Sequence, residues 1–310
     1  MDKAIGCYFE LELRKGEHYH KDALRLNTAR NCFEYVLLVR KYTKVYIPYF
    51  TCEVMLEPLQ RHKIQYEFYH INEQLEPIED IVLQEEEAFL YTNYFGLKQS
   101  CVERLAKVYG SHLIVDNAQA FFAPRLDGID TFYSPRKFFG VADGGYLYID
   151  KLLDIELQQD YSYDRMSHLL KRIDLSAEEG YADFRRNDDS FINQPIKRMS
   201  KLTEAILCSI DYEEAKVRRL SVYKELHKVL HHENRFQFEL NLDDVPMVYP
   251  YLIEDGEQKK KELIRGRIYV ATYWPNVFNW SKEDCVEYNL VKNIISIPIN
   301  NEKIINIWKK

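Results

Sequence analysis

Short apolar or aromatic runs alternate with helical patterns along the first half of the chain. The runs that predict strands are Lys44–Tyr49, Gln65–Tyr69, Ala88–Asn93, Ser111–Asp116, Asp130–Ser134 and Gly145–Asp150. Between them, apolar residues at helical spacing predict helices over Arg30–Lys41, Cys52–His62 and Ser100–Gly110. Strands separated by helices of this length are typical of βαβ units, so the pattern predicts an α/β fold with a large, mostly parallel sheet and helices on both faces.

The pattern changes near residue 200. Apolar residues recur at helical spacing over Leu202–Leu226, which is too long for one βαβ crossover, so we expect a long helix that links two lobes. Beyond it, a smaller α+β lobe is predicted, with a helix and three strands over Gly256–Ile264, Val248–Ile253, Arg267–Thr272 and Ile294–Pro298. We therefore expect an N-terminal arm with a large α/β domain in residues 1–195, and the linking helix with a small domain in residues 196–310. The polar segment Asp183–Ser190 is typical of a solvated loop.

Composition indicates a folded protein and argues against several classes of function. The chain has 310 residues, of which 46% are hydrophobic and 29% charged, close to globular averages. Its net charge of −7 does not favour a nucleic-acid partner, which would normally meet a basic face. No apolar run approaches the roughly 18–20 residues of a membrane span, and Met1–Gly16 lacks a signal-peptide core, so we expect a cytoplasmic protein with no membrane partner. Its six cysteines form no Cys-x-x-Cys pair, so the sequence indicates neither disulfides nor a metal site.

The first candidate for chemistry is Asp116. It follows Leu113-Ile114-Val115, which places it at the carboxyl end of a predicted buried strand, where open α/β sheets form their ligand crevices. A buried carboxylate must accept donors or face a cation. Asp116 therefore either caps the segment that follows it or interacts with a bound cation.

The second candidate is Lys137, which lies between Pro135 and Phe138-Phe139. If this apolar segment is buried, the loss of hydration lowers the pKa of the lysine and makes its amine a usable nucleophile. The alternative is a surface lysine whose stem covers the two phenylalanines.

Together the two residues match the needs of pyridoxal phosphate (PLP), which takes a lysine for a Schiff base and a carboxylate beside its pyridinium nitrogen. PLP also needs a phosphate site. Asn27, Thr28, Ala29 and Arg30, directly before a predicted helix, offer side-chain donors and N-terminal amides for it. Thr28 is equally compatible with an ordinary N-cap.

These segments resemble the DegT-type nucleotide-sugar aminotransferases, which are fold type I (aspartate aminotransferase-like) PLP enzymes. Val115–Gln119 is similar to the family's Asp-x-x-Gln element, and Ser134–Gly145 to its lysine segment, which ends in an acidic residue and two glycines. The resemblance implies that Lys137 forms the internal aldimine, that Asp116 faces the pyridine nitrogen and that Gln119 approaches the phenolic oxygen.

Other segments follow in the family's order: Ile47–Thr51 (a Pro-x-x-Thr element), Tyr91–Gly96, Arg198-Met199-Ser200, Tyr273-Trp274-Pro275 and Ile295–Pro298. Arg198–Ser200 resembles the motif that opens the long helix. Tyr273–Pro275 resembles the substrate-facing loop of the small lobe, and Ile295–Pro298 resembles its final strand. From these positions the resemblance implies further cofactor contacts by Phe50, Thr51, Cys52, Asn93 and Ser134.

Two positions depart from the family's pattern. Cys52 stands where many relatives carry an aromatic residue that stacks on the pyridine ring, so Phe50 or Tyr49 is expected to take that role. Phe132 stands where the family often has a phosphate-binding serine, so the phosphate contacts are expected from Thr28, Arg30 or Ser134.

The resemblance implies an aminotransferase that moves nitrogen from an amino donor, glutamate, to a nucleotide-linked keto-sugar in surface-polysaccharide synthesis. It also implies a homodimer, since fold type I sites lie at a dimer interface, with a second-subunit contact in residues 183–198. Two alternatives stay open. One is another PLP-dependent reaction, although Lys137 argues against the family's dehydratases, which carry histidine there. The other is a catalytically weak cofactor-binding or partner protein that keeps the fold.

Overall fold

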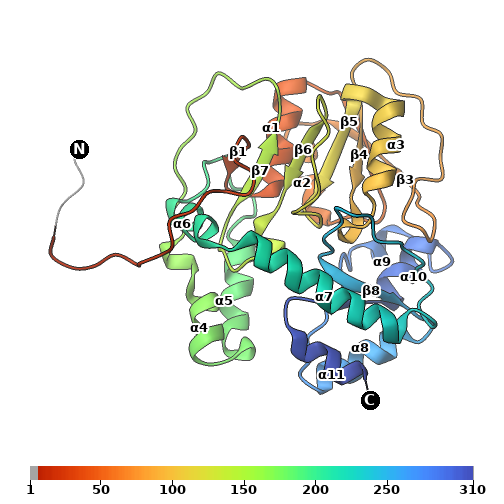
Figure 1. The fold of residues 1–310 in the computed structure, drawn as a ribbon. Helices are drawn as coiled ribbons and strands as arrows, with labels where there is room; N and C mark the ends of the chain where they lie inside the picture. The colour runs from red at the N-terminus through yellow and green to blue at the C-terminus, as the bar shows by residue number, and fades with distance from the viewer. Residues whose placement is uncertain (1–5, 310) are drawn as a thin grey trace.

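A seven-stranded sheet forms the centre of the chain in the computed structural model, which describes residues 6–309 (Figure 1). Its strands are β1 (Leu24–Leu26), β2 (Lys44–Pro48), β3 (Gln65–Tyr69), β4 (Glu87–Thr92), β5 (Leu113–Asn117), β6 (Asp130–Tyr133) and β7 (Gly145–Tyr148). They lie in the order β1-β7-β6-β5-β4-β2-β3. Strands β2 to β6 pair in parallel, and β7 is antiparallel to both neighbours. The predicted mostly parallel sheet is confirmed.

Both faces of this sheet are buried, which explains the nearly continuous apolar runs in its strands. In β4, Ala88 and Leu90 belong to the core on one face, while Phe89 and Tyr91 belong to the core on the other. Helices α1 (Ala29–Arg40) and α2 (Leu56–Arg61) cover the first face, and α3 (Gln99–Tyr109) covers the second.

A smaller lobe follows the sheet along the chain. Helices α6 (Lys201–Ser209) and α7 (Tyr212–Leu230) lead to it, and α7 runs along the boundary between the large sheet and the small lobe (Figure 1). The lobe contains the antiparallel pair β8 (Val248–Leu252) and β9 (Ile294–Pro298), with α8 (Gly256–Arg265), α9 (Val277–Trp280), α10 (Val286–Asn293) and α11 (Ile305–Trp308). One continuous apolar core joins the second face of the sheet to α7 and to this lobe. The proposed boundary at 195/196 falls between α5 and α6 and stays a prediction.

Three expectations from the sequence are wrong. Asp183–Ser190 is not a loop, because all but its last residue belong to helix α5 (Ala177–Asp189), which packs antiparallel to α4 (Ser167–Asp174) in a projecting hairpin (Figure 1). The long helix is broken at residues 210 and 211, where the carboxylate of Asp211 accepts the N–H of Glu214 (3.0 Å) and caps α7. Arg267–Thr272 forms no strand, and only Ala271 makes a single bridge to Ser296.

Among the helices within residues 6–309, none combines the length and the apolar character that a membrane crossing requires.

Candidate active site

A cavity of about 320 Å³ lies at the carboxyl end of the parallel strands. The segments that follow β2, β5 and β6 line it, and open α/β sheets bind ligands in such crevices outside the carboxyl ends of their strands. Nine of the twelve residues predicted for the site line it: Thr28, Ala29, Arg30, Thr51, Cys52, Asp116, Gln119, Ser134 and Lys137. The volume falls within the range of about 300–1,000 Å³ that is typical of small-molecule sites.

The other three predicted residues lie behind the cavity wall. Asn27 bonds to the backbone of residues 195 and 197, at 3.1 and 3.2 Å. The amide of Asn93 donates to Gln99 (3.1 Å), and Phe50 packs edge-on against Trp274 with ring centroids 4.6 Å apart. Of these three, Phe50 supports a residue that lines the cavity, Trp274, and direct cofactor contacts by all three stay predictions.

Asp116 is buried at the end of β5, as the sequence predicts. Its Oδ1 accepts the N–H of Ala118 (2.8 Å), so the local capping contact is present. Burial raises the pKa of Asp116 to about 6, and the Ala118 N–H, the charge of Lys137 and the hydroxyl of Thr92 oppose that rise. Because these groups do not fully replace the water that the carboxylate loses on burial, a cation in the cavity would stabilise its ionised form.

Lys137 lies at the end of a short 3-10 helix, Pro135–Lys137, and reaches the same cavity. Lys137 is exposed. A loss of hydration was expected only if its segment were buried, so that condition is not met. Its Nζ lies 5.6 Å from the centroid of the Tyr273 ring, which the small lobe contributes. Burial raises the pKa of both the Asp116 carboxyl and the Cys52 thiol, and the positive charge of Lys137 opposes this at both groups. The amine, the acid and the thiol therefore interact across one space.

The acidic residue and two glycines that end the lysine segment have structural roles. Asp143, fully buried, accepts the N–H of Ser200 (2.8 Å), the Ser200 hydroxyl (2.7 Å) and the Thr203 hydroxyl at the start of α6. A Cβ at Gly145 would lie 2.6 Å from the carbonyl carbon of Thr28, so only glycine lets β7 approach α1 this closely. The segment that carries Lys137 is thus fixed against two helix N-termini.

A buried arginine of α7 fixes the other side of the lysine segment. The Arg219 guanidinium donates to the carbonyls of Phe138 (3.1 Å) and Met247 (3.0 Å), and burial lowers its pKa to about 10. Because Phe138 follows Lys137 directly, α7 helps to set the position of the lysine.

The start of α1 has the features of an anion site. Thr28 is the N-cap of α1, which confirms one of the two roles predicted for it, and its hydroxyl accepts the N–H of Asn31 (3.0 Å). The first turn of this described helix carries no acidic residue. Arg30 donates to Glu57 and to the carbonyl of Phe191 (3.0 Å), while its buried Nε has no partner among the described residues. Backbone amides and a guanidinium are therefore available to a dianion here.

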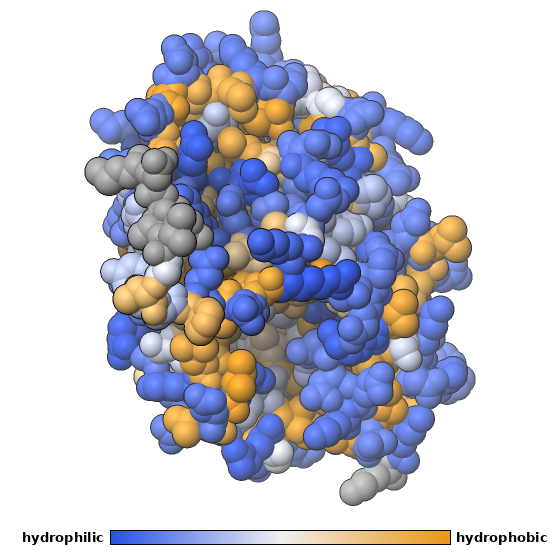
Figure 2. Space-filling model, turned by 60° about the vertical axis from the view of Figure 1, so that its left-hand side comes forward, coloured by the Kyte–Doolittle hydropathy of each residue, from blue (hydrophilic) through white to orange (hydrophobic). Residues whose placement is uncertain are grey.

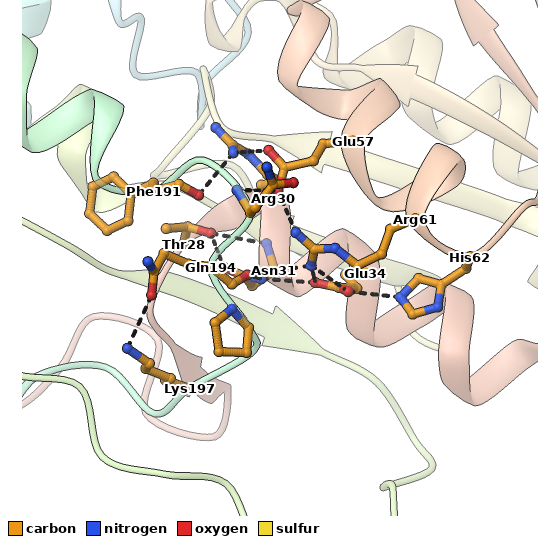
Figure 3. Close-up of polar contacts among 12 residues, drawn as sticks. Thr28, Arg30, Asn31, Glu34, Glu57, Arg61, His62, Phe191, Gln194 and Lys197 are labelled. Carbon is orange, nitrogen blue, oxygen red and sulfur yellow. Dashed lines mark hydrogen bonds and ion pairs between the residues drawn. The ribbon is translucent and has the colours of Figure 1, made fainter.

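Two carboxylates hold the segment of residues 191–197 against α1 and α2 (Figure 3). Glu57 pairs with Arg30 and Arg61, and Glu34 accepts two contacts from Arg61 (2.8 and 2.9 Å) and one from His62 (2.7 Å). The network reaches the segment through the carbonyls of Phe191 and Gln194. Phe191 and its neighbour then form one wall of the cavity.

Trp274 is the main residue of the site to which the sequence assigned no role of its own. It lines the cavity, and Asn276 two residues later donates to the carbonyl of Thr51 (3.0 Å), which holds this loop of the small lobe on the large lobe. Its backbone is left-handed, with φ of 58°, a conformation that is rare for a bulky side chain and is often found at functional sites. Trp274 therefore supplies the cavity with an aromatic surface, which the side chain at position 52, a cysteine, cannot supply.

The projecting hairpin contributes more residues that sequence reasoning missed. Arg185, Asp188 and Asp189 of α5 line the cavity, together with Arg136 and Glu53. Arg136 forms an ion pair with Asp188. The sequence placed residues 183–190 in a loop, whereas this region is helical and part of it lines the cavity of its own chain. The contact with a second subunit that is expected in residues 183–198 stays a prediction. No local pattern indicated this, because only the tertiary fold brings the C-terminal end of α5 to a cavity whose other walls come from distant parts of the chain.

Comparisons with known proteins agree with this geometry. No family model and no curated protein matches the sequence. Solved structures do match, among them CalS13, a sugar aminotransferase from Micromonospora echinospora, with 13% identity, a TM-score of 0.57 and coverage of 92% of this chain and 85% of that chain. NtdA from Bacillus subtilis, with bound cofactor PMP, has 12% identity, a TM-score of 0.60 and coverage of 93% and 73%. A DegT DnrJ EryC1 StrS aminotransferase from Brucella abortus has 14% identity, a TM-score of 0.56 and coverage of 93% and 85%. The chain has the fold of these aminotransferases, as its sequence predicted.

Proposed function

We propose that this protein is a PLP-dependent aminotransferase that moves an amino group from an amino acid donor to a keto-sugar. The observation that carries the proposal is that an amine, Lys137, and a buried carboxylate, Asp116, meet in one cavity beside the N-terminus of α1. The names of the structural neighbours support the proposal, since CalS13 is a sugar aminotransferase, which supports the class of substrate, and NtdA was solved with bound cofactor PMP, which supports the cofactor.

The residues present fit PLP. The buried Asp116 lacks a full complement of donors, the Nε of Arg30 has no partner among the described residues, and Thr28, Ala29 and Arg30 at the start of α1 line the cavity. When bound, PLP carries the amino group between donor and acceptor and withdraws electrons from the carbon that bears it.

The residues of the chain would divide the remaining work. Lys137 would hold the cofactor through its amine and then move a proton to and from the α-carbon of the donor. Ionised Asp116 would stabilise a positive charge on the ring nitrogen. The phosphate would be held by the first-turn amides of α1 with Thr28, Arg30 and Ser134. Trp274 would exclude water from one side of the cavity, in place of an aromatic residue at position 52.

The finer parts of the proposal follow from the family resemblance. The acceptor is a nucleotide-linked keto-sugar, the donor is glutamate, and the reaction serves surface-polysaccharide synthesis in the cytoplasm. The protein acts as a homodimer.

Reduction with borohydride followed by mass spectrometry tests the site directly. Treatment of the PLP-loaded protein should give one phosphopyridoxyl adduct, located on Lys137 and absent from Lys137→Ala. Lys98, a buried lysine paired with Glu76 outside the cavity, is the matched control and should stay unmodified. An adduct on any other lysine would refute the assignment of the site.

Addition of glutamate to the loaded protein tests the reaction. Aminotransfer predicts loss of the visible absorption of bound PLP with release of one equivalent of 2-oxoglutarate. Retention of the absorption would leave a cofactor-binding protein without this donor reaction, and loss of it without 2-oxoglutarate would indicate another PLP-dependent reaction.

A further inference from the structure

A second cluster of reactive side chains lies outside the cavity, where the large sheet meets the small lobe. His70 follows β3 directly, whereas Cys285 and Glu287 lie at the start of α10. One ligand atom from each residue lies within 4.8 Å of the other two. An imidazole, a thiol and a carboxylate from two lobes therefore converge on one small volume.

The carboxylate and the imidazole are already positioned by the fold. Glu287 is 1% exposed, and its Oε1 accepts the backbone N–H of Ile71 (2.8 Å). The same oxygen lies 3.1 Å from Nδ1 of His70, whose ring stacks on Tyr49 with centroids 4.5 Å apart. Few rotamers remain to either side chain, so an ion that binds here would order mainly the half-buried Cys285.

The set of ligands is chemically selective. Cysteine sulfur, histidine nitrogen and carboxylate oxygen are the three kinds of ligand that Zn²⁺ takes in proteins, and soft thiolate disfavours Mg²⁺ and Ca²⁺. Tetrahedral zinc with its usual bond lengths places such ligand atoms about 3.4–3.6 Å apart. The ligand atoms of the cluster lie within 4.8 Å of one another, and His70 Nδ1 and Glu287 Oε1 are 3.1 Å apart, so the approach that zinc needs is about 1 Å at most and falls to the half-buried Cys285.

We propose that His70, Cys285 and Glu287 bind one Zn²⁺ ion that ties the end of β3 to α10. A water molecule would complete the coordination, or Asp284 would, since its Oδ1 lies 4.0 Å from the sulfur of Cys285. The site differs from the candidate active site in residues and in place. The two sites are linked through Tyr94: burial and the negative charge of Glu287 raise the pKa of its hydroxyl, and its ring packs against Trp274 with centroids 5.8 Å apart.

Metal titration of the full-length protein tests the proposal. The protein is freed of metal with a chelator, the chelator is removed, and Zn²⁺ or Co²⁺ is added. We expect one tight equivalent of Zn²⁺, a rise in melting temperature, and a thiolate-to-cobalt charge-transfer absorption with Co²⁺. Cys285→Ser and His70→Gln should abolish the absorption and weaken Zn²⁺ binding by about a hundredfold or more, since even outer partners of metal sites contribute about 10–100-fold.

Two further variants keep the test decisive. Glu287→Gln retains an oxygen for the Ile71 N–H but removes the charged ligand, so it should fold and bind Zn²⁺ weakly. Cys208→Ser alters another half-buried cysteine, which lies outside the cluster, and should bind as the wild type does. Absence of a tight equivalent, or unchanged binding in Cys285→Ser, would overturn the proposal and leave a hydrogen-bonded contact between the lobes. Lys137→Ala should keep the metal, so this outcome is independent of the proposed function.

Discussion

Asp116 is an ionisable side chain in a buried environment that disfavours its charged form. It lies among the buried side chains of β5, where a neutral residue would be more stable, and burial raises its pKa from 3.8 to about 6. Such a placement is typical of functional carboxylates, whose environment is arranged for a ligand and not for stability.

The burial of this carboxyl predicts how the stability of the cofactor-free protein changes with pH. Because the folded state binds the proton more tightly than the unfolded state, the stabilisation from protonated Asp116 is fully present below about pH 4 and is lost as the pH rises through about 6. A difference of about two pKa units corresponds to a cost on the order of 3 kcal/mol at pH 8. Asp116→Asn, whose neutral amide still accepts the Ala118 N–H, should therefore be the more stable protein at pH 8.

Urea unfolding of the cofactor-free proteins at pH 8 and at pH 4.5 checks this. The advantage of the Asn variant should shrink toward zero at the lower pH, and PLP should stabilise the wild type more than the variant. If the free energies of unfolding of the two proteins differed by the same amount at both pH values, the destabilisation would not come from burial of the ionised Asp116 carboxylate.

At the scale of elements, the sequence located the strands well because their signal is local. Runs such as Leu113-Ile114-Val115 are buried on both faces, and the observed strands β2 to β7 all overlap the predicted ones. The hairpin of α4 and α5 was missed for the opposite reason. Gly180 and Asn187 are the buried residues of α5, so it has almost no apolar face, although its N-cap Ser176 was readable from the sequence.

Asp143 joins the lysine segment, residues 134–145, to the start of α6, so its loss should affect both elements. Asp143→Ala leaves a buried N–H and two hydroxyls without their acceptor, and the loss of charge-assisted hydrogen bonds of this kind is expected to cost on the order of 2–4 kcal/mol of unfolding free energy. It should also weaken PLP retention by displacing Lys137. Urea unfolding measures the first effect, and equilibrium dialysis of PLP measures the second.

Ser176→Ala is the control for this prediction. It removes the N-cap of α5, an acceptor at a helix start that lies at the surface, so it should cost only about 1 kcal/mol. Equal destabilisation by the two substitutions would show that Asp143 acts as an ordinary cap and does not fix the lysine segment.

At the scale of the whole molecule, apolar side chains gather on the lower part of the face in Figure 2, the region in which Figure 1 places α4 and α5. The hairpin exposes several large apolar residues: Leu170, Ile173, Leu175 and Tyr181. Exposed apolar clusters of this kind mark interaction surfaces. Since α5 also lines the cavity, a second copy of the chain on this hairpin would lie close to the site.

We therefore predict a homodimer that uses the α4–α5 hairpin. Ile173→Asp places a charge on the most exposed of these side chains and should raise the dimer dissociation constant by about tenfold or more, because an unpaired charge is costly to bury. Val217→Asp, at a residue of α7 that is 67% exposed, is the matched control and should leave the dimer unchanged. Sedimentation velocity at micromolar concentration distinguishes the outcomes, and a monomeric wild type would contradict the prediction.

The parts of this protein that could be predicted before its structure was known are those whose signal is local. Strand periodicity, the carboxyl-end position of Asp116, the helix start at Thr28 and the segment around Lys137 each depend on neighbours within a few residues. The distant residues that complete the site could be identified only from the folded chain. Trp274 reaches the cavity through a loop whose Asn276 bonds to a residue 225 positions earlier, and the His70 and Glu287 of the second cluster are 217 positions apart. Such contacts depend on how the two lobes pack, because no periodicity or motif along the chain encodes the distance between side chains on different lobes.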